Sequence, residues 1–274
     1  MSINKIDYLV IGHITADLTP TGTTIGGTVA YSGRTAQTLG LETAVLSSAA
    51  ADYNWQQALP GIQVQAIPTE YTSTFENIYT ANGRHQLLHH VAAPITPTDV
   101  PQDWHRAAIV HLAPLTNEVD PNIVDLFSNS LIGMTPQGWL RRWDENKHVY
   151  ARAWEAAAWI LPHAAAVILS YEDLLDRAML DQYRQWSRLL VMTDGEKGCT
   201  VFLGDEVRHI PTPIVRQVEP TGAGDIFAAA FLYRLYQTDG NPWEAARFAN
   251  KIASQSVTQA GLDAKLDAIK RVIT

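Results

Sequence analysis

Cysteine and N-terminal apolar sequence are both scarce in this chain. A single cysteine, Cys199, excludes an internal disulfide and is typical of a reducing compartment. The apolar run within residues 1–12 is interrupted by Lys5 and Asp7, and it is too short for a signal peptide or a membrane span. We therefore expect a cytoplasmic protein that does not associate with membranes.

Positive charge is also in short supply. The chain has 20 Lys and Arg residues against 28 Asp and Glu, a net charge of −8 over 274 residues. Broad surfaces for nucleic acid or anionic lipid need clustered Lys and Arg, so neither partner is expected. Hydrophobic residues make up 46% and charged residues 18%, which describes a compact folded chain. A small molecule is the expected ligand, and an anionic one would be held by backbone amides, a metal or a few placed cations.

Several common site signatures are missing. The chain has no Gly-x-x-x-x-Gly-Lys-Ser/Thr, so a P-loop kinase is unsupported, and Gly12 does not begin a Gly-x-Gly-x-x-Gly dinucleotide fingerprint. His85 and His89 have a helical metal spacing but fall in a segment that reads as strand. Four residues of strand span about 13 Å, so one ion cannot bridge these two side chains.

Short apolar runs alternate with helical patterns along most of the chain. The runs indicative of buried strands are 8–11, 44–46, 108–112, 131–134, 166–169 and 189–192, and the clearest helical patterns are 28–39, 119–127, 150–161 and 243–257. This alternation predicts an α/β fold: a doubly wound, mainly parallel sheet flanked by helices, in a single domain over 1–274. Ligands of such sheets bind at the carboxyl ends of the strands.

One region breaks the alternation. Residues 63–93 are extended and β-prone, with a turn at 81–84 and no good helix. Together with roughly 18–27 they are expected to form a small sheet that stands off the main one as a lid and excludes water from a site. A plain edge hairpin is the alternative.

The most informative stretch is Thr221-Gly222-Ala223-Gly224-Asp225, which leads directly into an apolar helical pattern. Glycines permit a tight turn, and unpaired amides and the positive end of the helix dipole gather at such a start, so it suits a phosphate group. A carboxylate beside a phosphate cradle repels the ligand, which favours Asp225 as the base that accepts a proton from the attacking group. An ordinary helix start, with Asp225 serving the first turn, is the alternative.

The order of the glycine motifs resembles the ribokinase-type (PfkB) carbohydrate kinase family over nearly the whole chain. The motifs are Gly12 with Asp17, Gly26-Gly27 opening a helix that closes at Leu39-Gly40, Thr193-Asp194-Gly195-Glu196-Lys197-Gly198, and Thr221 to Asp225. Phe248-Ala249-Asn250 and Val257 to Gly261 also stand where that family has its last nucleotide-binding helix. The resemblance implies an ATP-dependent phosphotransferase that uses Mg²⁺.

The resemblance also assigns roles. Asp225 would be the general base, and the amides of Gly222, Ala223 and Gly224 would form an anion hole for the transferred phosphoryl. The substrate would contact Asp17, Gly26, Gly27 and Tyr31, and the nucleotide would contact Thr193, Gly195, Gly198, Thr221, Asn250 near the adenine, and Gly261. The plainer alternatives are an exposed loop for Asp17, a simple turn for 193–198, and a helix-face residue without a ligand for Asn250.

Departures from the family pattern bear on ions and substrate. Glu219 stands where an Asp tied to a monovalent-cation site is common, which argues against potassium activation. Ser170-Tyr171-Glu172-Asp173 replaces an Asn-x-x-Glu that organises Mg²⁺ through water, so Asp173 or Glu172 would take that acidic role. Tyr31 and Thr15 replace polar residues that ribokinase uses on ribose, and the segment is similar to inositol- or nucleoside-kinase-like members.

The sequence therefore predicts a kinase that phosphorylates a hydroxyl of a small sugar or cyclitol, as a monomer or homodimer. Two alternatives stay open. One is a nucleoside kinase of the same family, and the other is a sugar- or nucleotide-binding regulator without catalysis, which the altered segment at 170–173 motivates.

Overall fold

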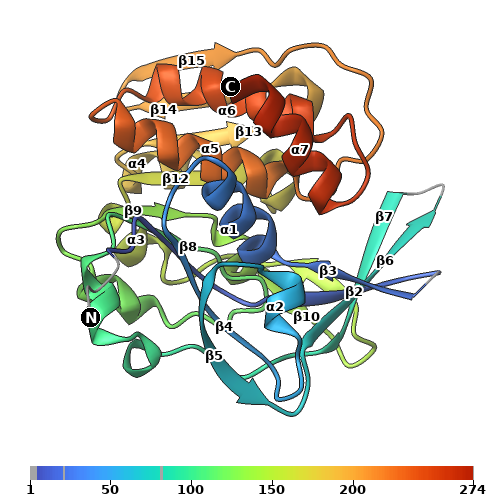
Figure 1. Cartoon of the computed structure of the whole chain (residues 1–274). Coiled ribbons are helices and arrows are strands. Elements are labelled where there is room, and N and C mark those ends of the chain that lie inside the picture. Colours follow the sequence, from blue (N-terminus) through green and yellow to red (C-terminus); the bar gives the residue numbers. More distant parts are fainter. Residues whose placement is uncertain (1–4, 21, 81–82, 274) are drawn as a thin grey trace.

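A computed structural model describes residues 5–20, 22–80 and 83–273, and its largest element is a nine-stranded sheet in the order β15-β14-β13-β12-β9-β8-β1-β4-β5 (Figure 1). The strands are β1 (Tyr8–Ile11), β4 (Thr43–Ala50), β5 (Gln63–Thr69), β8 (Ile109–Leu112), β9 (Leu131–Met134), β12 (Ala166–Ser170), β13 (Leu190–Thr193), β14 (Cys199–Leu203) and β15 (Glu206–Ile210). Pairing is parallel from β13 to β5, and β14 and β15 extend the sheet in antiparallel fashion. The predicted doubly wound, mainly parallel sheet is confirmed.

Helices cover both faces of this sheet (Figure 1). Consecutive side chains of a strand point to opposite faces, and those of the central strand β1 are apolar on both, so each face needs a cover. Tyr8 and Val10 of β1 belong to a core shared with α1, α5, α6 and α7, whereas Leu9 and Ile11 belong to a core shared with α3 and α4. The helices are α1 (Thr28–Thr38), α2 (Trp55–Ala58), α3 (Ala157–Ile160), α4 (Arg177–Trp186), α5 (Ala223–Gln237), α6 (Pro242–Ser256) and α7 (Leu262–Ile273).

Two of the predicted helices are wrong. Segment 119–127 forms a 3₁₀ helix over Pro121–Leu126, which still buries Ile123 and Val124. Segment 150–161 begins as β11 (Val149–Ala151), paired with β10 (Arg141–Trp143), and becomes α-helical only in the four residues of α3. An apolar pattern records burial, and short 3₁₀ turns and hairpins satisfy it as well as a helix does.

A second sheet of four strands extends from the main body in the order β3-β2-β6-β7 (Figure 1). Its strands are β2 (Thr15–Thr19), β3 (Gly22–Gly26), β6 (Ser73–Thr80) and β7 (Gly83–His90). Segment 63–69 was expected in this small sheet, but it is β5 of the main sheet, paired in parallel with β4 along its whole length. His85 and His89 lie in β7, as expected of a strand. The turn predicted at 81–84 includes residues 81 and 82, which lie outside the described residues.

A buried polar network joins the end of β1 to the second sheet. The Glu118 carboxylate accepts hydrogen bonds from the backbone N–H groups of His13 (2.8 Å), Leu115 (3.0 Å) and Thr116 (2.6 Å). The ring of His13 bonds to Ser73 Oγ at 2.7 Å through Nδ1 and to the carbonyl of residue 93 at 2.8 Å through Nε2. These bonds fix the point at which the chain passes from the main sheet into the smaller one.

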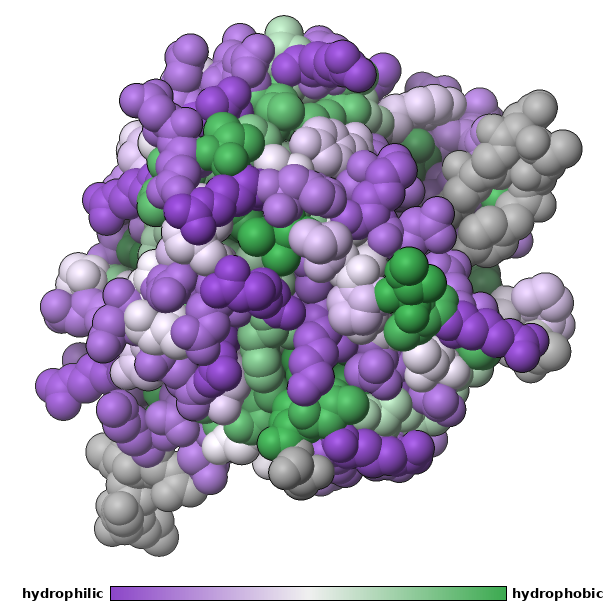
Figure 2. Space-filling view, turned by 90° about the horizontal axis from the view of Figure 1, so that it is seen from above, coloured by the Kyte–Doolittle hydropathy of each residue, from purple (hydrophilic) through white to green (hydrophobic). Residues whose placement is uncertain are grey.

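No α-helix in the ranges that the structure describes combines the length and apolar character that a bilayer span requires. Seen from above, the molecule presents a mainly polar face on which hydrophobic residues form small separate groups (Figure 2).

Candidate active site

The glycine turn, defined here as Thr221 to Asp225, leads into the buried helix α5. Gly222 is left-handed, with φ 76° and ψ 0°, a conformation that glycine adopts without strain. Its N–H group and that of Gly224 have no hydrogen-bond partner among the described residues, whereas the Ala223 N–H donates to the Pro220 carbonyl at 3.0 Å. Of the three amides predicted to form an anion hole, two are therefore open at the start of α5 and one is engaged.

Tyr31 lies directly beneath the glycine turn. A Cβ at Gly222 would overlap the Tyr31 ring, and the tyrosine is only 6% exposed. Burial raises the pKa of its hydroxyl, and the charges of Glu219, Asp225 and Asp17 raise it further. Tyr31 was expected to contact the substrate. The ring also supports the turn that packs on it, and its contact with a substrate stays a prediction.

Asp225 lies in the first turn of α5 and is held by α1. Thr28 Oγ1 donates to Asp225 Oδ1 at 2.8 Å, and Ser32 Oγ, one turn later, donates to the Asp225 backbone carbonyl at 2.9 Å. Burial raises the pKa of Asp225 to about 6; the Thr28 hydrogen bond and the charge of Arg141 oppose the rise, and Asp173 and Asp17 add to it. The carboxylate is thus still ionised at neutral pH, but it is a stronger base than an ordinary aspartate.

Arg141 and Thr28 are site residues that the sequence reasoning missed. Arg141 begins β10, and its guanidinium lies 5.9 Å from the centre of the Phe75 ring of β6 and close enough to Asp225 to lower its pKa. Its sequence context, an Arg-Arg pair before a tryptophan, offers no catalytic signal. Thr28 directly follows the Gly26-Gly27 pair, and that position was a usable signal.

The expected substrate residues gather where β2 begins. Asp17 Oδ1 accepts a hydrogen bond from Thr15 Oγ1 at 2.9 Å. A Cβ at Gly26 would overlap the Asp17 carboxylate, and Gly27, with φ 89°, lies against the backbone of His13 to Thr15. The two glycines therefore let the start of α1 approach β2 closely. This approach brings Asp17 within electrostatic reach of Asp225.

The expected nucleotide residues divide into open and buried positions. Thr193 ends β13 and its hydroxyl donates to the Leu169 carbonyl at 3.2 Å, and Gly195 and Thr221 are partly or fully open to solvent. Gly198 is buried where β14 begins, against the end of β15, and a Cβ there would overlap the Ile210 carbonyl.

Asn250 is also buried, at 4% exposed. Its side-chain amide donates to the Ile210 carbonyl at 2.8 Å and to the Pro211 carbonyl at 3.3 Å. These bonds tie α6 to the end of β15, and they do not support the expectation that Asn250 lies beside an adenine. Gly261 is exposed, and its N–H donates to Glu219 Oε2 at 2.7 Å.

The two candidate metal residues line a cavity of about 710 Å³ together with Arg141, His85, His148 and Tyr150. Asp173 accepts hydrogen bonds from Gln137 Nε2 (2.9 Å) and from the Ser170 N–H (3.1 Å), and Glu172 is exposed. Within the described residues no three His, Cys, Asp or Glu side chains cluster as a metal cage. One or two carboxylates beside an open space suit Mg²⁺, which takes most of its ligands from phosphate and water.

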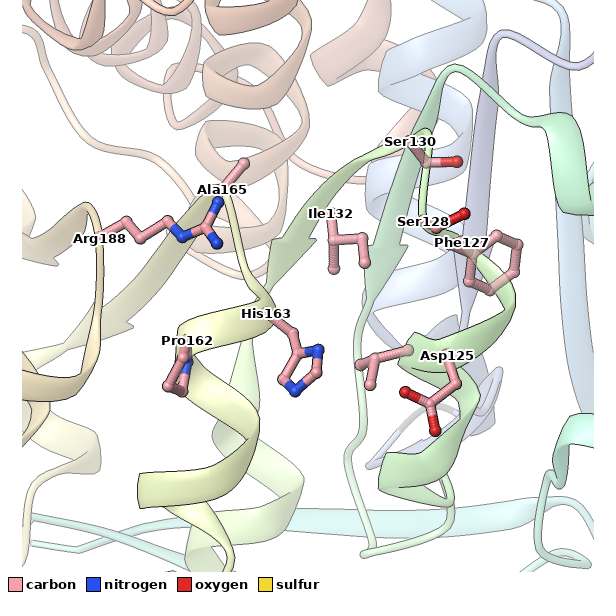
Figure 3. Close-up of a pocket in the computed structure, with 10 residues that line it drawn as sticks. Asp125, Phe127, Ser128, Ser130, Ile132, Pro162, His163, Ala165 and Arg188 are labelled. Carbon is pink, nitrogen blue, oxygen red and sulfur yellow. The ribbon is translucent and has the colours of Figure 1, made fainter.

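A second cavity lies where the strands β9 and β12 begin, at the amino ends of the parallel strands. It has a volume of about 480 Å³ and is lined by residues beside the first residues of β9 and β12, including Ser130 and Ala165, with Asp125, His163 and Arg188 around it (Figure 3). Asp225 is within electrostatic reach of Asp17 and Asp173, which follow the carboxyl ends of β1 and β12. The candidate active site is therefore at the carboxyl ends of the strands, and this cavity is separate from it.

Comparison with known proteins identifies related kinases. The family model described as pfkB family carbohydrate kinase matches residues 73–269. A cytidine kinase of Thermococcus kodakarensis is 26% identical over 250 residues, which cover 83% of this chain and 87% of the relative. An inositol 3-kinase of Oryza sativa subsp. japonica is 27% identical over 305 residues, covering 99% of this chain and 74% of the relative.

Solved structures share the fold. A pyrophosphate-dependent kinase in the ribokinase family, complexed with a pyrophosphate analog and myo-inositol, superposes with a TM-score of 0.79 at 22% identity, covering 95% of this chain and 99% of the other. A ribokinase from Thermotoga maritima superposes with a TM-score of 0.73 at 17% identity, covering 98% and 99%. At these identities the likeness concerns the fold.

Proposed function

Because the chain belongs to the pfkB family of carbohydrate kinases, we propose that it transfers the γ-phosphoryl group of ATP to a hydroxyl of a small cyclitol or sugar, with Asp225 as the general base. The observation that carries this proposal is the position of Asp225. A carboxylate with a pKa of about 6 stands in the same turn as the open amides of Gly222 and Gly224. A proton acceptor and a phosphate cradle are thus a single structural unit.

In the proposed reaction the acceptor hydroxyl gives its proton to an Asp225 carboxylate oxygen as its own oxygen bonds to the γ-phosphorus. The bond from that phosphorus to the bridging oxygen breaks, and ADP leaves with the electron pair. The Gly222 and Gly224 amides and the positive end of α5 stabilise the charge on the transferred group. The Thr28 hydroxyl, 2.8 Å from Asp225, orients the carboxylate.

Cations would assist the same transfer. Arg141 lies within electrostatic reach of Asp225 and lines the 710 Å³ cavity, so its guanidinium can balance the phosphate charge as the transfer proceeds. Mg²⁺, when bound at Asp173 with Glu172 nearby, would neutralise part of the charge on the donor phosphates. The second sheet, with Arg141 stacked on Phe75 at its base, would act as the lid that limits water at the site.

A cyclitol is the preferred acceptor for two reasons. A carboxylate oxygen can accept more than one hydrogen bond, so Asp17, within electrostatic reach of Asp225, can receive a ring hydroxyl in addition to the Thr15 hydroxyl. The rice relative is an inositol 3-kinase, and a structural neighbour was solved with myo-inositol. A nucleoside is the second candidate, because the Thermococcus relative is a cytidine kinase that aligns with most of this chain.

The donor needs its own test. The Asn250 side-chain N–H groups are engaged with backbone carbonyls, so they are not available to an adenine, and a neighbour of the same fold is pyrophosphate-dependent. Purified chain should therefore be assayed with Mg²⁺ and each of two donors, ATP and pyrophosphate, against inositols, hexoses, pentoses and nucleosides.

We expect ADP formation that depends on an inositol or a sugar. Turnover with nucleosides alone would favour the nucleoside kinase, and turnover with pyrophosphate alone would replace ATP as donor. Binding of polyol or nucleotide without turnover on any combination would favour the regulator and contradict the proposal.

A further inference from the structure

One fully buried charge has no role in the chemistry described above. Lys265 of α7 is 0% exposed, although lysine side chains almost never lose all contact with water unless they are paired. Transfer of an ammonium group from water into a protein interior costs several kcal/mol even after relaxation of the surroundings. The contacts of its Nζ atom show what compensates for that cost.

The Lys265 ammonium reaches the segment that precedes the glycine turn. Its Nζ donates to the Glu219 backbone carbonyl at 2.5 Å and lies 4.0 Å from Glu219 Oε2. The same carboxylate oxygen accepts the Gly261 N–H at 2.7 Å, and the Glu219 N–H donates to the Val257 carbonyl at 3.2 Å. Glu219 is therefore fixed at its N–H, its carbonyl and its side chain, and the only cation among these contacts is Lys265.

A short covalent path connects this anchor to the anion hole. Glu219 is followed by Pro220, whose ring fixes φ and transmits the orientation of the preceding peptide. The Pro220 carbonyl accepts the Ala223 N–H at 3.0 Å, and the Gly222 carbonyl accepts the Ile226 N–H at 2.9 Å. A displacement of the Glu219 carbonyl is therefore passed to the first turn of α5, which carries Asp225.

We propose that Lys265 is a positioning residue that serves as a built-in cation: its ammonium holds the Glu219 carbonyl so that the open amides of Gly222 and Gly224 face the transferred phosphoryl. This inference rests on the proposed kinase function. The turn needs such an anchor because Gly222 lies in a left-handed conformation and the amides gain catalytic value only in one orientation. Lys265 touches neither substrate, so its effect is on the orientation of the amides.

The test replaces Lys265 by methionine, which fills a similar volume without charge, in the full-length chain. A misplacement of about 1 Å at a reacting group can cost about 10²-fold in rate, so we expect kcat to fall by at least about tenfold while KM for the acceptor stays within about threefold. A loss of packing alone would instead lower the melting temperature without separating kcat from KM.

Lys251→Met is the matched control. Lys251 Nζ also donates to a backbone carbonyl, that of Val272 at 3.2 Å, but the residue is exposed and lies on α6. We expect its kcat to stay within about twofold of the wild type, since surface contacts of this kind contribute little. Thermal melts of both variants, with kcat measured well below the melting temperature, separate turnover from unfolding.

Each outcome bears on the inference. Normal kcat in Lys265→Met, or a rise in KM that accounts for the whole loss of kcat/KM, would overturn it. If Lys265→Met does not fold, Lys265→Gln, which keeps an N–H donor without the charge, takes its place and should show a loss of the same kind in kcat. Failure of both variants to fold would make Lys265 a determinant of global stability and contradict a positioning role. Absence of turnover in the wild type would instead contradict the proposed function.

Discussion

Replacement of Asp225 by asparagine should remove turnover and raise stability at the same time. Asparagine keeps an oxygen for the Thr28 hydroxyl, 2.8 Å away, but it has no basic site at neutral pH. A positioned base contributes about 10²–10⁴ in rate, so kcat should fall by that factor. ATP binding, measured by calorimetry, should change little because the amides of the turn remain.

The stability gain follows from the electrostatics of the site. The pKa of Asp225 rises from 3.8 to about 6 on folding. At neutral pH this corresponds to a cost on the order of 3 kcal/mol for the ionised form, since one pKa unit equals about 1.4 kcal/mol. A carboxylate in the first turn of a helix recovers about 0.3–1 kcal/mol from the dipole, which asparagine loses. We therefore expect a net gain of about 2–3 kcal/mol in the free energy of unfolding at pH 7.

The gain must also have the right pH dependence. A carboxyl group whose pKa is raised in the folded state binds more protons folded than unfolded between pH 3.8 and about 6, so the wild type loses stability as the pH rises through that window. The advantage of Asp225→Asn should thus be full at pH 7 and vanish near pH 4. Urea titrations at both pH values test this, with the exposed Asp205→Asn as control. Near-normal turnover, or a stability loss at pH 7, would refute the reasoning.

Three further changes test the surroundings of the site. Gly222→Ala should reduce kcat, and it should destabilise the protein more than Gly240→Ala does. Both glycines have positive φ, but only a Cβ at position 222 would overlap an aromatic ring. Kinetics and thermal melts measure the two effects. Glu118→Gln should lower the free energy of unfolding by about 1–3 kcal/mol in urea titrations, since an amide cannot accept all the N–H groups that the carboxylate binds, whereas the exposed Glu155→Gln should be neutral. Arg141→Met should raise the pKa of Asp225 and reduce kcat. Arg141→Lys should restore the midpoint of the pH–rate profile more fully than it restores kcat.

The fold was largely predictable because parallel strands buried on both faces leave a strong signal. Each of the predicted strands, such as 8–11 and 131–134, is a strand of the main sheet. Errors arose where burial alone shaped the sequence. Segment 119–127 is apolar because it covers the sheet, and nothing in its pattern distinguishes a 3₁₀ helix from an α-helix.

The site was predictable only where a motif fixes the backbone. The glycine turn can be recognised in the sequence because its left-handed conformation favours glycine at position 222. Asn250 is of a residue type that suits ligands, yet its side-chain N–H groups hold the end of β15. Tyr31 supports the glycine turn, and the sequence could not show that packing. Arg141 and Lys265 reach the site from β10 and α7, and only the folded arrangement reveals contacts between segments so distant in the chain.

Asp225 is proposed to take the proton of the substrate hydroxyl, and the pH dependence of kcat/KM tests this role most directly because that ratio reports groups of the free enzyme. For the wild type we predict a rise to a plateau with a midpoint near pH 6. Thr28→Val, which removes the hydrogen bond that stabilises the ionised carboxylate, should move the midpoint upward, whereas Ser32→Ala, which loses only a bond to the backbone carbonyl, should leave it in place. A profile without an acidic limb, or a midpoint indifferent to Thr28, would contradict the account.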